Sequence, residues 1–189
     1  MNISDRKIYA FIDSQNLNIS TRKLGWKMDW KKFREFLADK YGVTKAFMFI
    51  GYVPEFEDMY RQLNEAGYAV VLKPTFDITK PQPETKDVNN PDEDKKPVKG
   101  NIDADLVLWA MKELPNYDKA VIISGDGDFY TLVEYLEEKG KLLKLLAPSG
   151  HYSNLFNRFE KYIERLDQHR GELTYRNHSR PKSSSPRSK

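Results

Sequence analysis

Short apolar segments alternate with amphipathic segments along most of this 189-residue chain. The apolar segments have the length and near-continuous hydrophobicity of strands that are buried on both faces of a sheet. They lie at residues 7–12, 44–52, 68–72, 117–124 and 141–147. This alternation predicts an α/β fold in which a central parallel five-stranded sheet has helices on both faces.

Amphipathic segments between the strands place apolar residues at helical spacing, which is typical of crossover helices. The expected helices begin or run at 16–24, after Asp29, and at 55–66, 102–114, 128–139 and 151–167. We therefore expect one domain over residues 1–167, interrupted by a long polar loop at 77–100 that is rich in proline and charge. Residues 168–189 carry six basic residues and one acid, and we expect this basic tail to be disordered.

Composition limits the chemistry that the chain can perform. The absence of cysteine excludes disulfides, thiolate metal sites and cysteine nucleophiles, and only three histidines are present. A bound metal would therefore have oxygen ligands, which favours Mg²⁺ or Mn²⁺. No apolar run approaches the roughly 18 residues that cross a membrane. The first residues lack the apolar core of a signal peptide, so we expect a cytoplasmic protein with no membrane partner.

Four aspartates occur where a parallel sheet would gather them. Asp13 follows the first strand, and Asp126 and Asp128 follow the fourth. Asp103 opens the helix that leads back into the fourth strand, so its carboxylate should start at the same edge. Asp105 is a weaker candidate. Because ligands bind at the carboxyl ends of parallel strands, we expect these acids to form one metal site.

Crowded carboxylates raise one another's pKa, and a divalent cation relieves that cost. Such a cation can activate water and neutralise charge on a phosphoryl group, which indicates hydrolysis of a phosphate ester. Structural roles remain open for Asp103, Asp126 and Asp128 as first-turn acids, helix caps or turn formers. Asp13 has no such alternative, since no predicted helix turn needs an acid after the first strand. Asn16 is either a helix cap or a donor to substrate, and Lys99 is either a solvated charge or a phosphate contact.

Other phosphate-binding and phosphatase patterns fit poorly. The chain contains no P-loop motif, and Gly125 and Gly127 lack the third glycine of a dinucleotide fingerprint. A phosphatase of the haloacid dehalogenase type needs Asp-x-Asp after the first strand, but residue 15 is glutamine. A Toprim-like site needs glutamate in place of Asp13.

Three motifs together resemble the NYN domain family of PIN-like nucleases, in its LabA-like branch. They are F-I-D-S-Q-N-L at 11–17, K-G-N-I-D-A-D-L at 99–106 and S-G-D-G-D-F at 124–129, and the resemblance spans about residues 7–167. It implies a Rossmann-like PIN/NYN fold and a ribonuclease that depends on Mg²⁺ or Mn²⁺. Its metal-site acids would be the following four residues: Asp13, Asp103, Asp126 and Asp128.

The resemblance also implies that Asn16 and Ser124 support the acids. The position of Lys99 near Asp103 indicates that Lys99, together with the basic tail, would hold the RNA backbone. The loop at 77–100 departs from the family pattern because it is longer and more charged, and it would gate substrate or bind a protein partner or a second copy of the chain. The alternative is an NYN module that binds RNA or protein without cleaving it.

Overall fold

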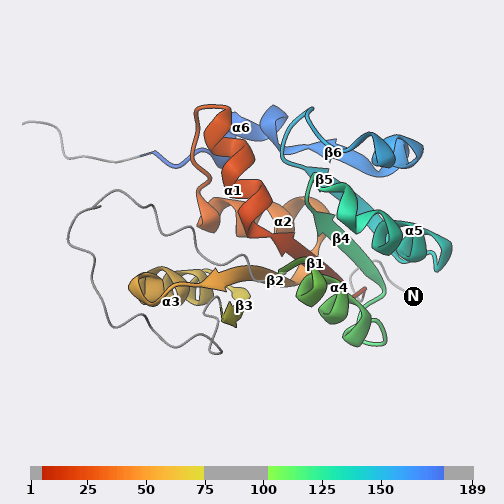
Figure 1. Cartoon of the computed structure of the whole chain (residues 1–189), viewed down its shortest axis with the longest axis horizontal. Coiled ribbons are helices and arrows are strands. Elements are labelled where there is room, and N and C mark those ends of the chain that lie inside the picture. The colour runs from red at the N-terminus through yellow and green to blue at the C-terminus, as the bar shows by residue number, and fades with distance from the viewer. Residues whose placement is uncertain (1–5, 75–101, 177–189) are drawn as a thin grey trace, which may run out of the picture.

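The computed structural model describes residues 6–74 and 102–176 of the chain, and Figure 1 shows how their elements are arranged. A parallel sheet crosses these residues in the strand order β3-β2-β1-β4-β5-β6. Its strands are β1 (Ile8–Asp13), β2 (Val43–Tyr52), β3 (Tyr68–Pro74), β4 (Lys119–Ile123), β5 (Leu142–Ala147) and β6 (Ile163–Arg165). The predicted parallel α/β architecture is confirmed, with six strands where the sequence indicated five.

Helices cover both faces of this sheet (Figure 1). They are α1 (Ser14–Lys23), α2 (Trp30–Tyr41), α3 (Glu57–Glu65), α4 (Ile102–Lys112), α5 (Tyr130–Glu138) and α6 (Arg170–Leu173), with 3-10 helices η2 (Pro54–Phe56), η3 (Gly127–Phe129), η4 (Asn154–Tyr162) and η5 (Leu166–His169). Alternate strand residues point to opposite faces. Ala10 and Ile12 therefore pack in the core under α1, α2 and α3, whereas Phe11 packs in the core under α4 and α5.

The segment after β5 differs from the single helix that we expected at 151–167. It forms η4, then the edge strand β6, then η5. Within η4 the buried residues are Phe156 and Phe159. Their spacing of three residues fits the repeat of a 3-10 helix. The residues that follow pair with β5 instead of continuing a helix, and this pairing covers what would otherwise be an open sheet edge.

The described part of the tail, residues 168–176, differs from the disorder that we expected there. Residues 168–176 continue through η5 and α6, and Leu173 is buried in the core under α2. An antiparallel bridge joins Thr174 to Met28, and the Asp29 N–H donates to the Leu173 carbonyl over 2.8 Å. The basic composition of the tail gave no indication of these contacts, because they are made by backbone atoms. The whole loop at 77–100, Lys99 included, and residues 177–189 lie outside the described residues.

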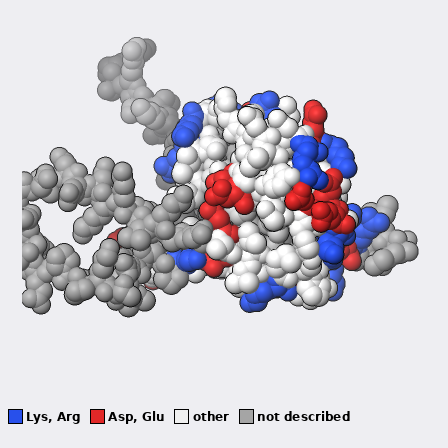
Figure 2. All heavy atoms as spheres, turned by 45° about the vertical axis from the view of Figure 1, so that its right-hand side comes forward, with Lys and Arg blue, Asp and Glu red and all other residues white. Residues whose placement is uncertain are grey.

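Charged side chains at the surface often lie beside charges of opposite sign. On the right-hand side of the face in Figure 2, basic and acidic side chains are in direct contact. Ion pairs of this kind link Arg158 with Glu134 and Glu137, and Lys161 with Glu137. None of the helices among the described residues has the length and apolar character needed to cross a lipid bilayer.

Replacing Leu173 by Ala tests whether the C-terminal segment belongs to the folded domain. Leu173 is 1% exposed, so the Leu173→Ala variant should lose roughly 2–5 kcal/mol of unfolding free energy. Leu155 is 57% exposed, and the matched Leu155→Ala change should stay within about 0.5 kcal/mol of the wild type. Urea unfolding followed by circular dichroism measures both. Equal effects of the two substitutions would contradict this placement of Leu173.

Candidate functional site

Asp13 ends β1 and is 5% exposed. One carboxylate oxygen accepts a hydrogen bond from the Asn16 N–H over 3.0 Å, so Asp13 is the N-cap of α1. The other oxygen accepts a hydrogen bond from the Ser124 hydroxyl, also over 3.0 Å. The helix therefore begins at Ser14 and not at Asn16, and Asp13 has a structural role that the sequence did not reveal.

The turn after β4 is joined directly to this carboxylate. Strands β1 and β4 pair in parallel with Ile12 opposite Ile123, which places the next residue of each strand side by side. The Ser124 hydroxyl donates to Asp13 and accepts from the Asp126 N–H over 3.1 Å. The Asn16 side-chain oxygen accepts from the Gly125 N–H over 3.0 Å. Asn16 and Ser124 thus brace the two strand ends against each other.

Asp103 lies on α4, which packs on the face of the sheet opposite to α1. Phe11 and Leu106 share the core under α4, and Asp103 lies one helical turn before Leu106. Asp13 lies two residues beyond Phe11, so it has the same strand parity. Helix α4 therefore directs its first turn toward Asp13.

The charges of two other predicted acids, Asp103 and Asp126, act on the buried Asp13 carboxylate. Burial is the main cause that raises the pKa of Asp13, and the charges of Asp103 and Asp126 raise it further. Hydrogen bonds from Asn16 and Ser124 oppose this rise without cancelling it. Asp13 therefore retains a proton more readily than an ordinary aspartate when no cation is bound.

The other predicted acids have different surroundings. The Asp126 carboxylate accepts from the Asp128 N–H over 3.1 Å and caps η3. The side chain of Asp128 is exposed. The Asp105 carboxylate forms an ion pair with the Lys73 ammonium of β3 over 3.0 Å. Asp105 therefore has a partner other than the acids around Asp13. The structure thus places Asp103 and Asp126 near enough for their charges to act on Asp13, and it leaves the Asp128 side chain exposed.

A segment that the sequence analysis missed packs against the acidic turn. The Ser153 N–H donates to the Gly125 carbonyl over 3.0 Å. A Cβ atom on Gly127 would lie 3.0 Å from the Cβ of Ser153 and nearer still to its hydroxyl oxygen. A Cβ atom on Gly125 would lie 3.4 Å from Pro148. The sequence could have predicted this packing from the position of the segment after β5, because the loop after that strand also emerges at the carboxyl edge of the sheet.

The donor set suits a hard divalent cation in kind, because all its side chains offer oxygen. Across residues 6–74 and 102–176, however, no group of three or more carboxylates or imidazoles is arranged to hold a metal ion. Magnesium commonly binds one or two carboxylates directly and keeps several waters. Asp13 and Asp126 are the residues that could hold such an ion, since Asp13 ends one central strand at this edge and Asp126 follows another.

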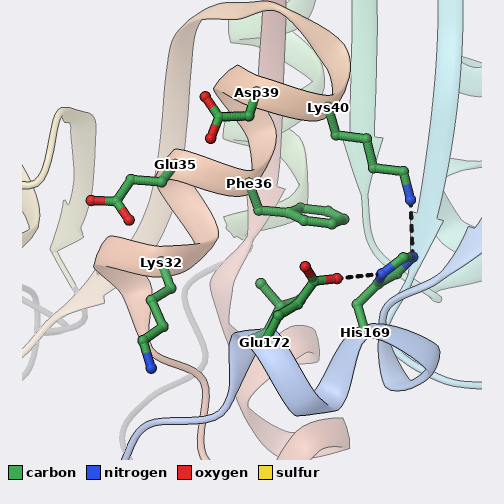
Figure 3. Close-up of a pocket in the computed structure, with 8 residues that line it drawn as sticks. Lys32, Glu35, Phe36, Asp39, Lys40, His169 and Glu172 are labelled. Carbon is green, nitrogen blue, oxygen red and sulfur yellow. Dashed lines mark hydrogen bonds and ion pairs between the residues drawn. The ribbon is translucent and has the colours of Figure 1, made fainter.

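A cavity of about 590 Å³ lies elsewhere, between α2 and the C-terminal segment. Figure 3 shows its lining, which contains none of the four aspartates: Lys32, Glu35, Phe36, Asp39, Lys40, His169, Glu172 and Leu173. His169 donates or accepts through both ring nitrogens, with Glu172 at 2.6 Å and Lys40 at 3.0 Å. We interpret the cavity as the seam where η5 and α6 dock on α2.

Fold and site together define a parallel α/β protein with an acidic carboxyl edge. The family model of the NYN domain matches residues 7–167, and the chain belongs to the NYN domain family. This family includes nucleases.

Two known proteins extend this assignment. A protein of Synechococcus elongatus named low amplitude and bright protein LabA is 26% identical over 166 residues, which cover 85% of this chain and 84% of that protein. The chain thus lies in the LabA-like branch. A crystal structure of a protein of unknown function from Vibrio parahaemolyticus has the same fold, with a TM-score of 0.69 and 21% identity over 93% of this chain and 99% of the other.

Replacing Asp13 by Asn tests the electrostatic cost at this edge. Because burial and neighbouring charge raise the pKa of Asp13, its stabilising contribution is present at low pH and is lost as the pH rises through that raised pKa. The Asp13→Asn variant lacks this titration, so its Tm relative to wild type should increase from about pH 4 to about pH 7 in EDTA. Thermal unfolding followed by circular dichroism measures the difference. A difference that does not change with pH would refute the assigned cause.

Replacing Gly127 by Ala tests the packing of the segment at Ser153. The added methyl group meets Ser153, so Gly127→Ala should cost roughly 1–3 kcal/mol. Adding Ser153→Gly to the same chain should recover part of that loss, since it removes the atoms in conflict. Gly171→Ala is the control, because nothing lies within 4 Å of a Cβ atom there. Chemical unfolding gives all these energies, and additive effects of the paired changes would argue against the contact.

Proposed function

We propose that this protein is an endoribonuclease that hydrolyses RNA phosphodiesters with the help of Mg²⁺ or Mn²⁺. One observation carries the proposal: a buried aspartate at the end of a central strand has a raised pKa beside two further acids. Membership of a family that includes nucleases supports the same reading. We keep the cytoplasm as the proposed location, which suits a chain that has no cysteine to oxidise.

Asp13 and Asp126 would hold the cation, Asp103 would orient a water in its coordination shell, and Asp128 would approach from the rim. When bound, such an ion supplies a water of lowered pKa and neutralises charge on the scissile phosphate. The protein's own part is positional. Ser124 holds Asp13 and the Asp126 backbone at once, and Asn16 holds the adjacent Gly125 N–H, so the acids do not have to reorganise when substrate arrives.

A second function is favoured by a different observation. Asp13 caps α1, Asp126 caps η3, and no three-ligand metal group exists within the described ranges. These roles would retain the acids in a module that binds RNA and does not cut it.

Cleavage of a labelled single-stranded RNA by purified protein separates the two functions. With Mg²⁺ or Mn²⁺ the wild type should cleave, and EDTA should abolish the activity. Asp13→Asn and Asp126→Asn should each reduce the rate by roughly 100-fold or more, as expected when a group that stabilises developing charge is lost. Asp39→Asn, an exposed acid at the cavity of Figure 3, should leave the rate unchanged.

Equal cleavage by wild type and by both site variants would identify a contaminating nuclease and end the proposal. Binding of the RNA with no cleavage in either metal would favour the non-cleaving module.

A further inference from the structure

Residues that follow α1 and residues of the C-terminal segment form one surface beside the end of α1. The Tyr175 N–H donates to the Lys27 carbonyl over 2.8 Å, next to the bridge between Met28 and Thr174. The Arg170 guanidinium donates to the carbonyls of residues 24 and 25 over 3.3 and 3.0 Å, just past the last turn of α1. Figure 1 shows α1 and α6 side by side at this point. The C-terminal segment thus completes a surface that neither segment forms alone.

This surface is strongly basic. We call it the α1–α6 basic surface, and its cations are the exposed residues Arg22, Lys23, Lys27, Arg170 and Arg176. Segments 22–29 and 170–176 contain two acids, Asp29 and Glu172. Asp29 caps α2 and pairs with Lys32, and Glu172 contacts His169.

No cation of the α1–α6 basic surface forms an ion pair with another described residue, unlike the paired charges around Arg158. Their positive charge is therefore available to an anionic partner.

An exposed aromatic ring lies among these cations. Tyr175 is 47% exposed, and the Lys27 ammonium lies 5.0 Å from the centre of its ring. Aromatic rings interleaved with basic groups bind single-stranded nucleic acids, because bases stack on the ring while cations contact the phosphates.

Helix α1 connects this surface to the acidic edge. Its N-cap is Asp13 and its last residues are Arg22 and Lys23, so its ten residues span roughly 15 Å between the two. The helix contains no acid, and its exposed side carries Gln15, Ile19 and Arg22. A polyanion that followed this side would meet no carboxylate of α1 itself before it reached Asp13.

We propose that the α1–α6 basic surface binds the backbone of single-stranded RNA, a few nucleotides away from the bond that lies at the acidic edge. The proposal rests on the proposed function, in which RNA is the ligand of that edge. Contact with the phosphates is independent of sequence and weakens with salt. Tyr175 supplies a stacking position that favours unpaired bases.

Binding of a fluorescent single-stranded RNA 12-mer, measured by anisotropy in EDTA at several salt concentrations, tests this proposal. The protein carries Asp126→Asn so that no RNA is cut. Adding Lys23→Gln and Lys27→Gln should raise Kd about tenfold and reduce the slope of log K against log salt by about 1.4, or roughly 0.7 for each lost contact.

Lys112→Gln with Lys139→Gln is the matched control. It removes the same charge from another lysine that lies over an aromatic ring and from another lysine at a helix end. Its Kd should stay within about twofold. Tyr175→Ala should also weaken binding about tenfold, and Tyr175→Phe should retain it, because the ring and not the hydroxyl stacks.

Equal Kd values for the two lysine pairs would overturn the inference, even if the wild type cleaves RNA. Loss of binding in the Lys23 and Lys27 pair alone would support it, even if the wild type cleaves nothing. A DNA 12-mer that binds equally well would show that the surface reads the phosphates and bases without the 2′-hydroxyl, which also supports it. Binding to phosphatidylserine vesicles with none to RNA would overturn it in favour of a membrane partner.

Discussion

One hydrogen bond, from the Ser124 hydroxyl to the Asp13 carboxylate, joins the two central strands at the edge where the site lies. It depends on the parallel register that sets Ile12 opposite Ile123, because a slip of one residue would point either side chain into the wrong layer. The Asp126 N–H and the cap of α1 attach to the same pair of residues. Positions of the acids thus follow from strand pairing, and the loops add restraint around it.

The same arrangement concentrates negative charge in a place where solvent is scarce. Hydrogen bonds from Asn16 and Ser124 stabilise the Asp13 carboxylate, yet burial and the charges of Asp103 and Asp126 still raise its pKa. The proposed divalent cation would offset this charge. The proposed RNA contact at the α1–α6 basic surface would give a polyanion a complementary region at the far end of α1.

Much of this could be predicted from the sequence, because strand periodicity and strand ends are local properties. The continuous apolar run before Ser124 and the acids after it indicated the edge of a parallel sheet correctly. The contacts made across the molecule had no local signal: Ser153 against the acidic turn, Thr174 beside Met28, and β6 at the sheet edge. The role of Asp13 as a helix cap is local, but it was still missed. The helix begins immediately after the strand, with no intervening turn residue to mark its start.

The central claim is that Asp13, Asp103 and Asp126 share one divalent cation. Crystals of the wild-type protein grown with Mn²⁺ test it most directly, through the anomalous scattering of the metal. The account predicts a Mn²⁺ peak about 2 Å from a carboxylate oxygen of Asp13 or Asp126, with Asp103 in the surrounding water shell. A crystal at saturating Mn²⁺ would contradict the account if it showed no peak at this edge and if the Asp13 and Asp126 carboxylates accepted hydrogen bonds from protein groups alone.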